Sequence, residues 1–233
     1  MASNPPPAPL QGFQRARNEE QRAQRRLLIL ETAAAMLAEM PVAEVSLNEL
    51  SRRVGLAKSN VLRYFESREA VLLELLHTAS QEWLEHLDDA LGRVVDSDAD
   101  LVGRSRAVAA TLATTLAARP VLCDLLSAQA AVLERNVSAR VAAEYKRAAI
   151  GDVETLAGLV DGRLPELGAA DALRFAAGAV MMAGTIWAHA HPSAAMLAAY
   201  EAEPALAAMR LDFPDPLHQL LETLLAGLLA KWD

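Results

Sequence analysis

Apolar residues recur three and four positions apart along most of the chain, and no stretch alternates polar with β-branched residues. This periodicity is that of amphipathic helices and predicts an all-α fold. We expect helices over residues 19–40, 68–91, 99–118, 121–135, 137–160, 170–189 and 216–231, with two shorter ones inside residues 46–65. In the first helix, Leu27, Leu30, Ala34 and Leu37 form the expected inner face. The Pro- and Ala-rich stretch 191–214 is expected to connect the last two helices.

Residues 46–65, SLNELSRRVGLAKSNVLRYF, are typical of two short helices joined by a tight turn. Ser46 and Glu49 fit a capping box, in which the Ser46 hydroxyl accepts from the Glu49 backbone N–H and the Glu49 carboxylate reaches back to the backbone N–H of Ser46. Gly55 lies where the chain leaves the first helix with positive φ. This layout predicts a DNA-binding helix-turn-helix, although the same geometry also occurs as plain packing in enzymes and adaptor domains.

The second helix of this motif has an inner and an outer side. Val61 and Phe65 lie four positions apart and anchor it, which leaves polar residues on its ends and outer face. Base-edge contacts are expected from Lys58, Ser59, Asn60 and Arg63, a thymine methyl contact from Ala57, and phosphate contacts from Ser46, Arg52, Arg53 and Tyr64. For Arg52 and Arg53, a solvated helix face is an almost equally good interpretation.

The same segment, with the helix before it and ESREAVLLELL after it, resembles the N-terminal domain of the tetracycline-repressor family of bacterial transcription regulators. The resemblance covers residues 20–75 and rests on Ser46, Leu50, Ser51, Gly55, Leu56, Val61, Phe65 and Arg68. It implies a three-helix DNA-binding domain, residues 19–67, and a larger helical domain for ligand binding and dimerisation, residues 68–233. It also places the end of the first helix that carries Arg22, Arg25 and Arg26 near the DNA backbone, with Arg22 and Arg25 as the expected contacts.

Three positions depart from the family pattern. Ala57 stands where the family often has the serine that caps the recognition helix, and loss of such a cap costs about 1 kcal/mol. Leu62 and Tyr64 stand where a tyrosine and a histidine are common, which removes two frequent phosphate donors. Arg63 and Tyr64 are the expected substitutes.

Charge is distributed unevenly along the chain. Residues 1–66 carry nine Lys and Arg against seven Glu, whereas the rest carries 13 Lys and Arg against 23 Asp and Glu, for a net charge of −8. An acidic body repels DNA, so contact is expected only at the N-terminal end. Residues 1–18, with four prolines among the first nine positions, are expected to form a disordered, mildly basic arm that either reaches DNA or has no role.

Composition limits the other function classes. The chain has 233 residues, 53% of them hydrophobic, and no apolar run long enough to span a bilayer without a charge or a proline. The N-terminus lacks the apolar core of a signal peptide, and the single cysteine, Cys123, agrees with a reducing compartment. We therefore expect a cytoplasmic protein with no membrane partner. No nucleophile elbow, phosphate loop or metal-ligand spacing is present, which predicts no enzymatic activity, no cofactor and no metal.

The last two helices have wide apolar faces. In the final helix, apolar residues cover more than half the circumference, which one chain cannot easily bury. In the resembled family these two helices pair with their two-fold mates as a four-helix bundle, which implies a homodimer; packing inside one chain is the alternative. The expected interface residues are Leu173, Ala177, Val180, Gly184, Leu217, Leu221, Leu224 and Leu228.

The helices between the two ends are expected to enclose an effector pocket, if one exists. The candidate lining residues are Trp83, Leu87, Leu112, Leu116, Leu122, Leu126, Met181, Met182 and Trp187. Their indole, thioether and aliphatic groups suit a mostly apolar or aromatic ligand. Taken singly, each of them fits an ordinary core position better.

Together these features predict a homodimeric regulator of transcription, most often a repressor in the resembled family. It would bind a palindromic operator in double-stranded DNA through two recognition helices about 34 Å apart. A small effector of unknown identity is expected to move the linking helix 68–91 and so change that separation. Three alternatives stay open: a regulator without a small-molecule effector, an all-α enzyme or binding protein with a structural helix-turn-helix, and an activator.

Overall fold

The computed structural model describes residues 10–230, with side chains from Glu19 onward. Within that part every regular element is a helix, which confirms the all-α prediction. The N-terminal part holds α1 (Leu10–Leu37), the 3₁₀ turn η1 (Val42–Glu44), α2 (Leu47–Val54) and α3 (Lys58–Val61). The rest holds α4 (Arg68–Val94), α5 (Leu101–Ala117), α6 (Pro120–Ala128), the π-helix η2 (Gln129–Leu133), α7 (Ala139–Asp161), α8 (Ala169–Ala190), α9 (Ala194–Ala202), α10 (Pro204–Ala207) and α11 (Pro214–Leu229).

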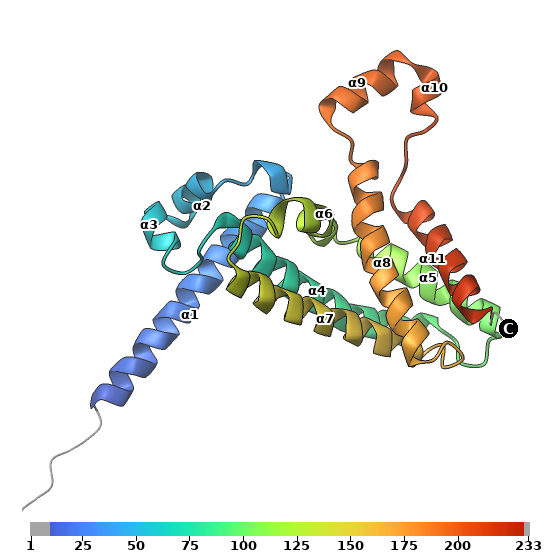
Figure 1. Cartoon of the computed structure of the whole chain (residues 1–233), viewed down its shortest axis with the longest axis horizontal. Helices are drawn as coiled ribbons and strands as arrows, with labels where there is room; N and C mark the ends of the chain where they lie inside the picture. Colours follow the sequence, from blue (N-terminus) through green and yellow to red (C-terminus); the bar gives the residue numbers. More distant parts are fainter. Residues whose placement is uncertain (1–9, 231–233) are drawn as a thin grey trace, which may run out of the picture.

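The first helix is longer than predicted. It begins at Leu10 instead of Glu19, because the prolines that oppose a helix end at Pro9 and the next one is Pro41. Residues 10–18 of the expected arm are therefore helical, and residues 1–9 lie outside the described part. Figure 1 shows the start of α1 projecting alone from the rest of the molecule.

The last turns of α1 pack against α2 and α4. Of the predicted face, Leu37 is buried and Leu30 and Ala34 pack half-buried against the core, but Leu27 is 56% exposed. Ile29, Ala33 and Met36, which were not predicted, are fully buried. The buried face is centred beside the predicted one because two apolar stripes run side by side here, and a helical period alone does not say which one is deeper in the core.

The long helix α4 joins the N-terminal part to the body. The Ser67 hydroxyl accepts from the backbone N–H of Ala70 at 3.1 Å and so caps the start of the helix. The start of α4 packs against α1, and the remainder packs against α5, α6 and α7. Buried side chains continue along α4 from Ala70 to Leu91, so the helix belongs to the cores of both parts.

In the body, α4 and α7 lie side by side, and α8 and α11 lie across one end of the molecule (Figure 1). α8 packs against α6, α7 and α11, and α11 also packs along α5. α8 is long and apolar enough to cross a membrane by length and composition, as is the pair of α5 with α6 and η2, which is bent by 92°. A helix buried in a protein core can have the same length and the same apolar composition.

The connection between α8 and α11 holds two short helices that the sequence did not predict. The Ser193 hydroxyl caps α9, and Pro204 occupies the first turn of α10, where its missing N–H is no loss. Neither helix buries a residue. The alanine content of this stretch favours helix even without tertiary packing, and Figure 1 shows the pair projecting from the body.

Candidate functional site

The helix-turn-helix forms with the predicted local geometry. The Ser46 hydroxyl accepts from the backbone N–H of Glu49 at 3.1 Å, and α2 begins at the next residue. At the other end Gly55 has a φ of 72°. The backbone N–H groups of Gly55 and Leu56 donate to the carbonyls of Arg52 and Ser51, which is the Schellman arrangement that closes a helix.

The second half of the predicted capping box does not form. The Glu49 carboxylate accepts from Arg52 at 2.6 Å and from Arg53 at 2.8 Å, so it does not turn back to Ser46. These hydrogen bonds lower the pKa of Glu49 to about 2. Arg53 is also held by Glu39 at 2.7 Å. Both arginines thus form ion pairs with glutamates of the same surface. This favours the interpretation of a solvated helix face over the interpretation that they contact phosphates.

The α3 segment presents the predicted side chains to solvent. It is a single helical turn, and Ala57 at its N-cap makes no side-chain hydrogen bond, as expected from the missing serine. Val61 and Phe65 are buried, and Tyr64 is half-buried. The exposed residues of the segment are Ala57, Lys58, Ser59, Asn60, Leu62 and Arg63.

Arg26 holds this segment in place and was not among the predicted site residues. Its Nη1 donates to the Tyr64 carbonyl at 2.7 Å, and its guanidinium lies 4.3 Å from the centre of the Phe65 ring. Its other terminal nitrogen pairs with Glu74 of α4. Arg22 and Arg25, one turn earlier and next in sequence, are exposed. The available signal was position, since Arg26 lies three residues before the buried Ile29 on the side of α1 that turns inward.

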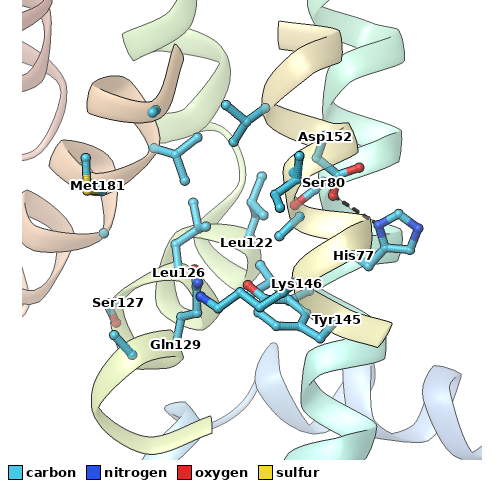
Figure 2. Close-up of a pocket in the computed structure, with 18 of the residues that line it drawn as sticks. His77, Ser80, Leu122, Leu126, Ser127, Gln129, Tyr145, Lys146, Asp152 and Met181 are labelled. Atoms are coloured by element: carbon cyan, nitrogen blue, oxygen red, sulfur yellow. Dashed lines mark hydrogen bonds and ion pairs between the residues drawn. The ribbon is translucent and has the colours of Figure 1, made fainter. Parts of the chain in front are cut away.

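The body contains a cavity of about 890 Å³ between α4, α6, α7 and α8. Figure 2 shows Leu122 and Leu126 of α6 facing Tyr145 and Lys146 of α7 across this space, with Met181 of α8 at its edge. Met181 is 67% exposed, so the cavity opens to solvent beside α8.

Four of the nine predicted effector residues line this cavity: Trp83, Leu122, Leu126 and Met181. The others lie elsewhere. Leu87, Leu112 and Leu116 are fully buried core residues, and Met182 packs against that core. Trp187 stacks on His191 at 3.9 Å and faces a separate cavity of about 660 Å³ near the return from α10.

Polar residues that the sequence analysis missed form one side of the cavity. On α4, His77 and Ser80 lie at helical spacing with Trp83; on α7, Tyr145 and Asp152 lie seven positions apart. The Asp152 carboxylate meets His77 Nδ1 at 3.0 Å, the contact drawn in Figure 2, and also accepts from Gln81. These spacings are visible in the sequence, but they gain meaning only once α4 and α7 are known to be neighbours.

Glu134 of the same cavity is held by two donors. Lys146 Nζ lies 2.7 Å from its carboxylate, and Gln129 Nε2 donates at 2.9 Å. Burial raises the pKa of Glu134, but these hydrogen bonds and the Lys146 charge outweigh burial and leave the pKa below its ordinary value. The π-helix η2 carries Gln129 at its first position and so turns it toward Glu134.

A smaller cavity of about 420 Å³ lies between the end of α3, α4 and α7. His77 and Tyr145 line both this cavity and the larger one. The partition between the two spaces is therefore made by two aromatic side chains, one from α4 and one from α7.

The predicted dimer residues divide among the chain's own core, its surface and the wall of the larger cavity, which is lined by Leu173, Ala177, Val180 and Gly184. Leu217 and Leu221 are fully buried against α5 and α8, so assigning them to an interface was wrong. Gly184 is also buried, because the backbone of Leu126 in α6 lies against it. Leu173 is exposed, and Ala177, Val180, Leu224 and Leu228 are half-buried. Leu220, which was not predicted, is 46% exposed on α11.

Within residues 10–230, no group of three His, Cys, Asp or Glu side chains is arranged to hold a metal ion. His189 and His191 lie two positions apart at the end of α8, and His191 Nδ1 is 3.0 Å from the Trp187 carbonyl.

Comparisons with known proteins agree with this architecture. Residues 29–75 match the model of the bacterial regulatory proteins of the tetR family, and residues 77–231 match that of the tetracyclin repressor-like C-terminal domain. The HTH-type transcriptional regulator EthR of Mycobacterium tuberculosis H37Rv is 36% identical over 76 residues, which are 33% of each chain. The aligned part thus spans about a third of that curated relative.

Two solved structures share the fold. A TetR transcriptional regulator from Rhodococcus sp. RHA1 aligns with a TM-score of 0.54 at 13% identity, covering 90% of this chain and 97% of that one. FadR of Bacillus subtilis, solved in complex with stearoyl-CoA, aligns with a TM-score of 0.50 at 14% identity, covering 89% and 99%. At these identities the likeness shows the fold alone. It confirms the predicted arrangement of an N-terminal helix-turn-helix domain and a larger helical domain.

Proposed function

The chain belongs to the tetracycline-repressor family of bacterial transcription regulators, and on that premise we propose that it is a homodimeric, ligand-responsive repressor. It binds an inverted-repeat operator in double-stranded DNA and releases it when a small, largely apolar effector occupies the cavity beside α4. Membership of the family makes the chain a regulator and not an enzyme. We place its action in the cytoplasm, where it meets DNA and no membrane.

The observation that carries the DNA-binding half is the surface of α3. Lys58, Ser59, Asn60 and Arg63 are exposed together on a segment whose ends are fixed by the Gly55 turn and by Arg26. Amide, hydroxyl and cationic groups of this kind read base edges in the major groove. The acidic charge of the body favours contact at this end of the molecule only.

The proposed dimer rests on the limited number of base contacts that a single recognition helix can make. One module contacts too few bases for specific binding, whereas a two-fold pair enters successive major grooves about 34 Å apart. The outward side of α11, with the exposed Leu220 and the half-buried Leu224 and Leu228, supplies apolar surface for a self-complementary interface. The buried Leu217 and Leu221 brace that surface from within.

The presence of a cavity in the body favours a regulator that binds a small-molecule effector over a regulator without one. A volume of about 890 Å³ with mainly apolar walls is within the range of small-molecule sites. Its wall includes Leu76, His77 and Trp83 of α4. This helix begins directly after the helix-turn-helix domain of residues 19–67, which we call the reading head. A ligand that binds one placement of α4 more tightly shifts the population of DNA-binding dimers.

Selection of bound duplexes from a random pool tests the DNA-binding half. We expect an enriched inverted repeat whose half-sites are centred about one helical turn apart or a multiple of it. Enrichment of a single half-site without symmetry would remove the dimer from the proposal. No enrichment at low salt would favour a structural helix-turn-helix. A promoter carrying the selected site, fused to a reporter, then separates repression from activation.

A further inference from the structure

The ionisable groups that line the cavity are mostly acidic. Glu134, Asp152 and Glu154 are accompanied by a single ammonium group, that of Lys146. Lys146 is already paired with Glu134 at 2.7 Å. With the lining histidines neutral, the wall therefore carries a net charge of two negative units, and Asp152 and Glu154 have no lysine or arginine among the lining residues to balance them.

The Asp152 carboxylate has two hydrogen-bond partners on α4. Gln81 donates to one oxygen, and His77 Nδ1 lies 3.0 Å from the other, where it donates in the tautomer that carries its proton on Nδ1. Neutral donors stabilise a carboxylate without cancelling its charge. A carboxylate has about four lone-pair sites, so Asp152 keeps the capacity to accept from a ligand.

Tyr145 lacks a partner for its hydroxyl. The residue is only 7% exposed, and within the described part of the chain its hydroxyl makes no hydrogen bond. Figure 2 shows the ring of Tyr145 reaching from α7 toward the space beside Leu126 and Gln129. The hydroxyl oxygen is not among the fully buried side-chain atoms of the described residues, so a ligand in the cavity can reach it and hydrogen-bond to it. Burial, with Glu134 and Asp152 nearby, also raises the pKa of Tyr145, so the phenol stays protonated.

We infer that the cavity binds a lipophilic amine. The apolar part of the ligand lies along Trp83, Leu122 and Leu126, and its ammonium group lies at the polar wall that carries the Asp152 carboxylate and the Tyr145 hydroxyl. An ammonium group has three donors and no acceptor, which matches a carboxylate and a phenol oxygen. A fatty acid or a phosphorylated thioester would add negative charge to a wall that is already net negative. This inference rests on the proposed role of the cavity as the effector site.

The head-group preference can be measured with three probes that share one chain. Decylamine, decanol and decanoate are titrated into the full-length protein by calorimetry at about pH 8, where imidazoles carry little charge. We expect decylamine to bind at least tenfold more tightly than decanoate, with decanol between them.

Two substitutions separate charge from hydrogen bonding. Asp152→Asn keeps the shape and one acceptor oxygen but removes the charge, so it should weaken decylamine about tenfold and leave decanol within about twofold. Tyr145→Phe removes only the hydroxyl oxygen and should weaken both decylamine and decanol several-fold. Glu144→Gln, on the same helix but outside this cavity, is the matched control and should change neither. Thermal melts of each variant establish that it is folded.

The outcomes distinguish this inference from the proposed function. Equal or tighter binding of decanoate, or an Asp152→Asn variant that loses decylamine and decanol alike, overturns the amine preference while leaving the cavity as a ligand site. Failure of all three probes to bind a protein that still binds its selected duplex overturns the preference together with the effector half of the proposal. Loss of duplex binding with amine binding intact overturns only the DNA-binding half.

Discussion

The carboxylate of Glu66 accepts two hydrogen bonds from Ser138, one from its backbone N–H at 2.6 Å and one from its hydroxyl at 2.8 Å. Glu66 directly follows the buried Phe65 at the end of the helix-turn-helix, and Ser138 is the N-cap of α7. These hydrogen bonds lower the pKa of Glu66. The reading head is therefore attached to the body through α4, which is continuous with it, through the start of α7, and through η1, where the Val42 backbone N–H donates to the Asp124 carboxylate of α6 at 2.7 Å.

The first prediction concerns this second attachment. Glu66→Ala removes both acceptors, so α7 and the cavity wall it carries lose their direct contact with the head. We expect the ratio of DNA affinities without and with ligand to fall by at least about twofold, with ligand affinity in the absence of DNA little changed. Glu44→Ala, an exposed glutamate in the same part of the chain, is the control. An unchanged ratio in Glu66→Ala would show that the contact between Glu66 and α7 does not carry the coupling, which leaves α4 and the η1–α6 contact.

The second prediction separates DNA contacts from structural arginines. Arg63→Ala should weaken binding to the selected operator by about 1–3 kcal/mol and leave the melting temperature unchanged. Arg22→Ala or Arg25→Ala should lower the salt dependence of binding by about one unit or less. Arg26→Ala should instead lower the melting temperature, because it frees the Tyr64 carbonyl and leaves Glu74 without its cation. An Arg26→Ala variant with wild-type stability would place Arg26 among the DNA contacts.

The third prediction locates the dimer interface on the outward side of α11. Leu220→Glu places a charge on the exposed stripe and should yield a folded monomer by sedimentation. Leu221→Glu buries an unpaired charge in the chain's own core and should unfold the protein. Leu27→Glu, exposed on α1 away from this surface, should remain dimeric. A dimeric Leu220→Glu variant would move the interface elsewhere.

The fourth prediction compares two glycines of α8. A Cβ at Gly184 would lie 2.9 Å from the backbone carbonyl oxygen of Leu126, whereas a Cβ at Gly178 would lie 2.9 Å from the end of the Leu224 side chain. Backbone cannot move aside as a side chain can, so Gly184→Ala should cost about 1–3 kcal/mol and distort the cavity next to Leu126. Gly178→Ala should be near neutral, since a helical alanine gains up to about 1 kcal/mol over glycine. Chemical denaturation of both variants measures the difference.

The fifth prediction concerns Cys123. Burial first, and then the neighbouring Asp124, raise the pKa of its thiol to about 12. The thiolate is the reactive form, so iodoacetamide at about pH 8 should leave the folded protein unmodified and label it fully in denaturant. Rapid labelling of the folded protein would contradict the buried position of Cys123.

The sequence predicted local features better than the partners of each helix. Ser46 and Gly55 act within a few residues of themselves, so the bounds of α2 could be predicted to the residue. Leu220 and Leu221 show the opposite case. Both are leucines in a helix that is apolar over more than half its circumference, and only the position of α5 decides that Leu221 is inside and Leu220 outside.

The candidate site follows the same division. Trp83, Leu122 and Leu126 could be proposed as cavity residues from their chemistry and approximate place. The polar residues of the cavity come from two helices, His77 from α4 and Tyr145 and Asp152 from α7. His77 and Asp152 are in contact although 75 residues separate them in the sequence, and no local pattern predicts such a contact. Gly184 was predicted at the dimer interface, but the backbone that lies against it is that of Leu126 in α6 of the same chain.

The segment from α9 to α10 leaves the body after α8 and returns before α11 without burying a residue in either of its helices. Such a segment contributes little to the core, and surface excursions of this kind tolerate inserted sequence better than packed helices do. It therefore offers a position at which a fluorescent domain or an affinity tag can be spliced into the chain between α8 and α11. A sensor built at this position would carry its reporter far along the sequence from the DNA-reading residues while remaining attached to both α8 and α11.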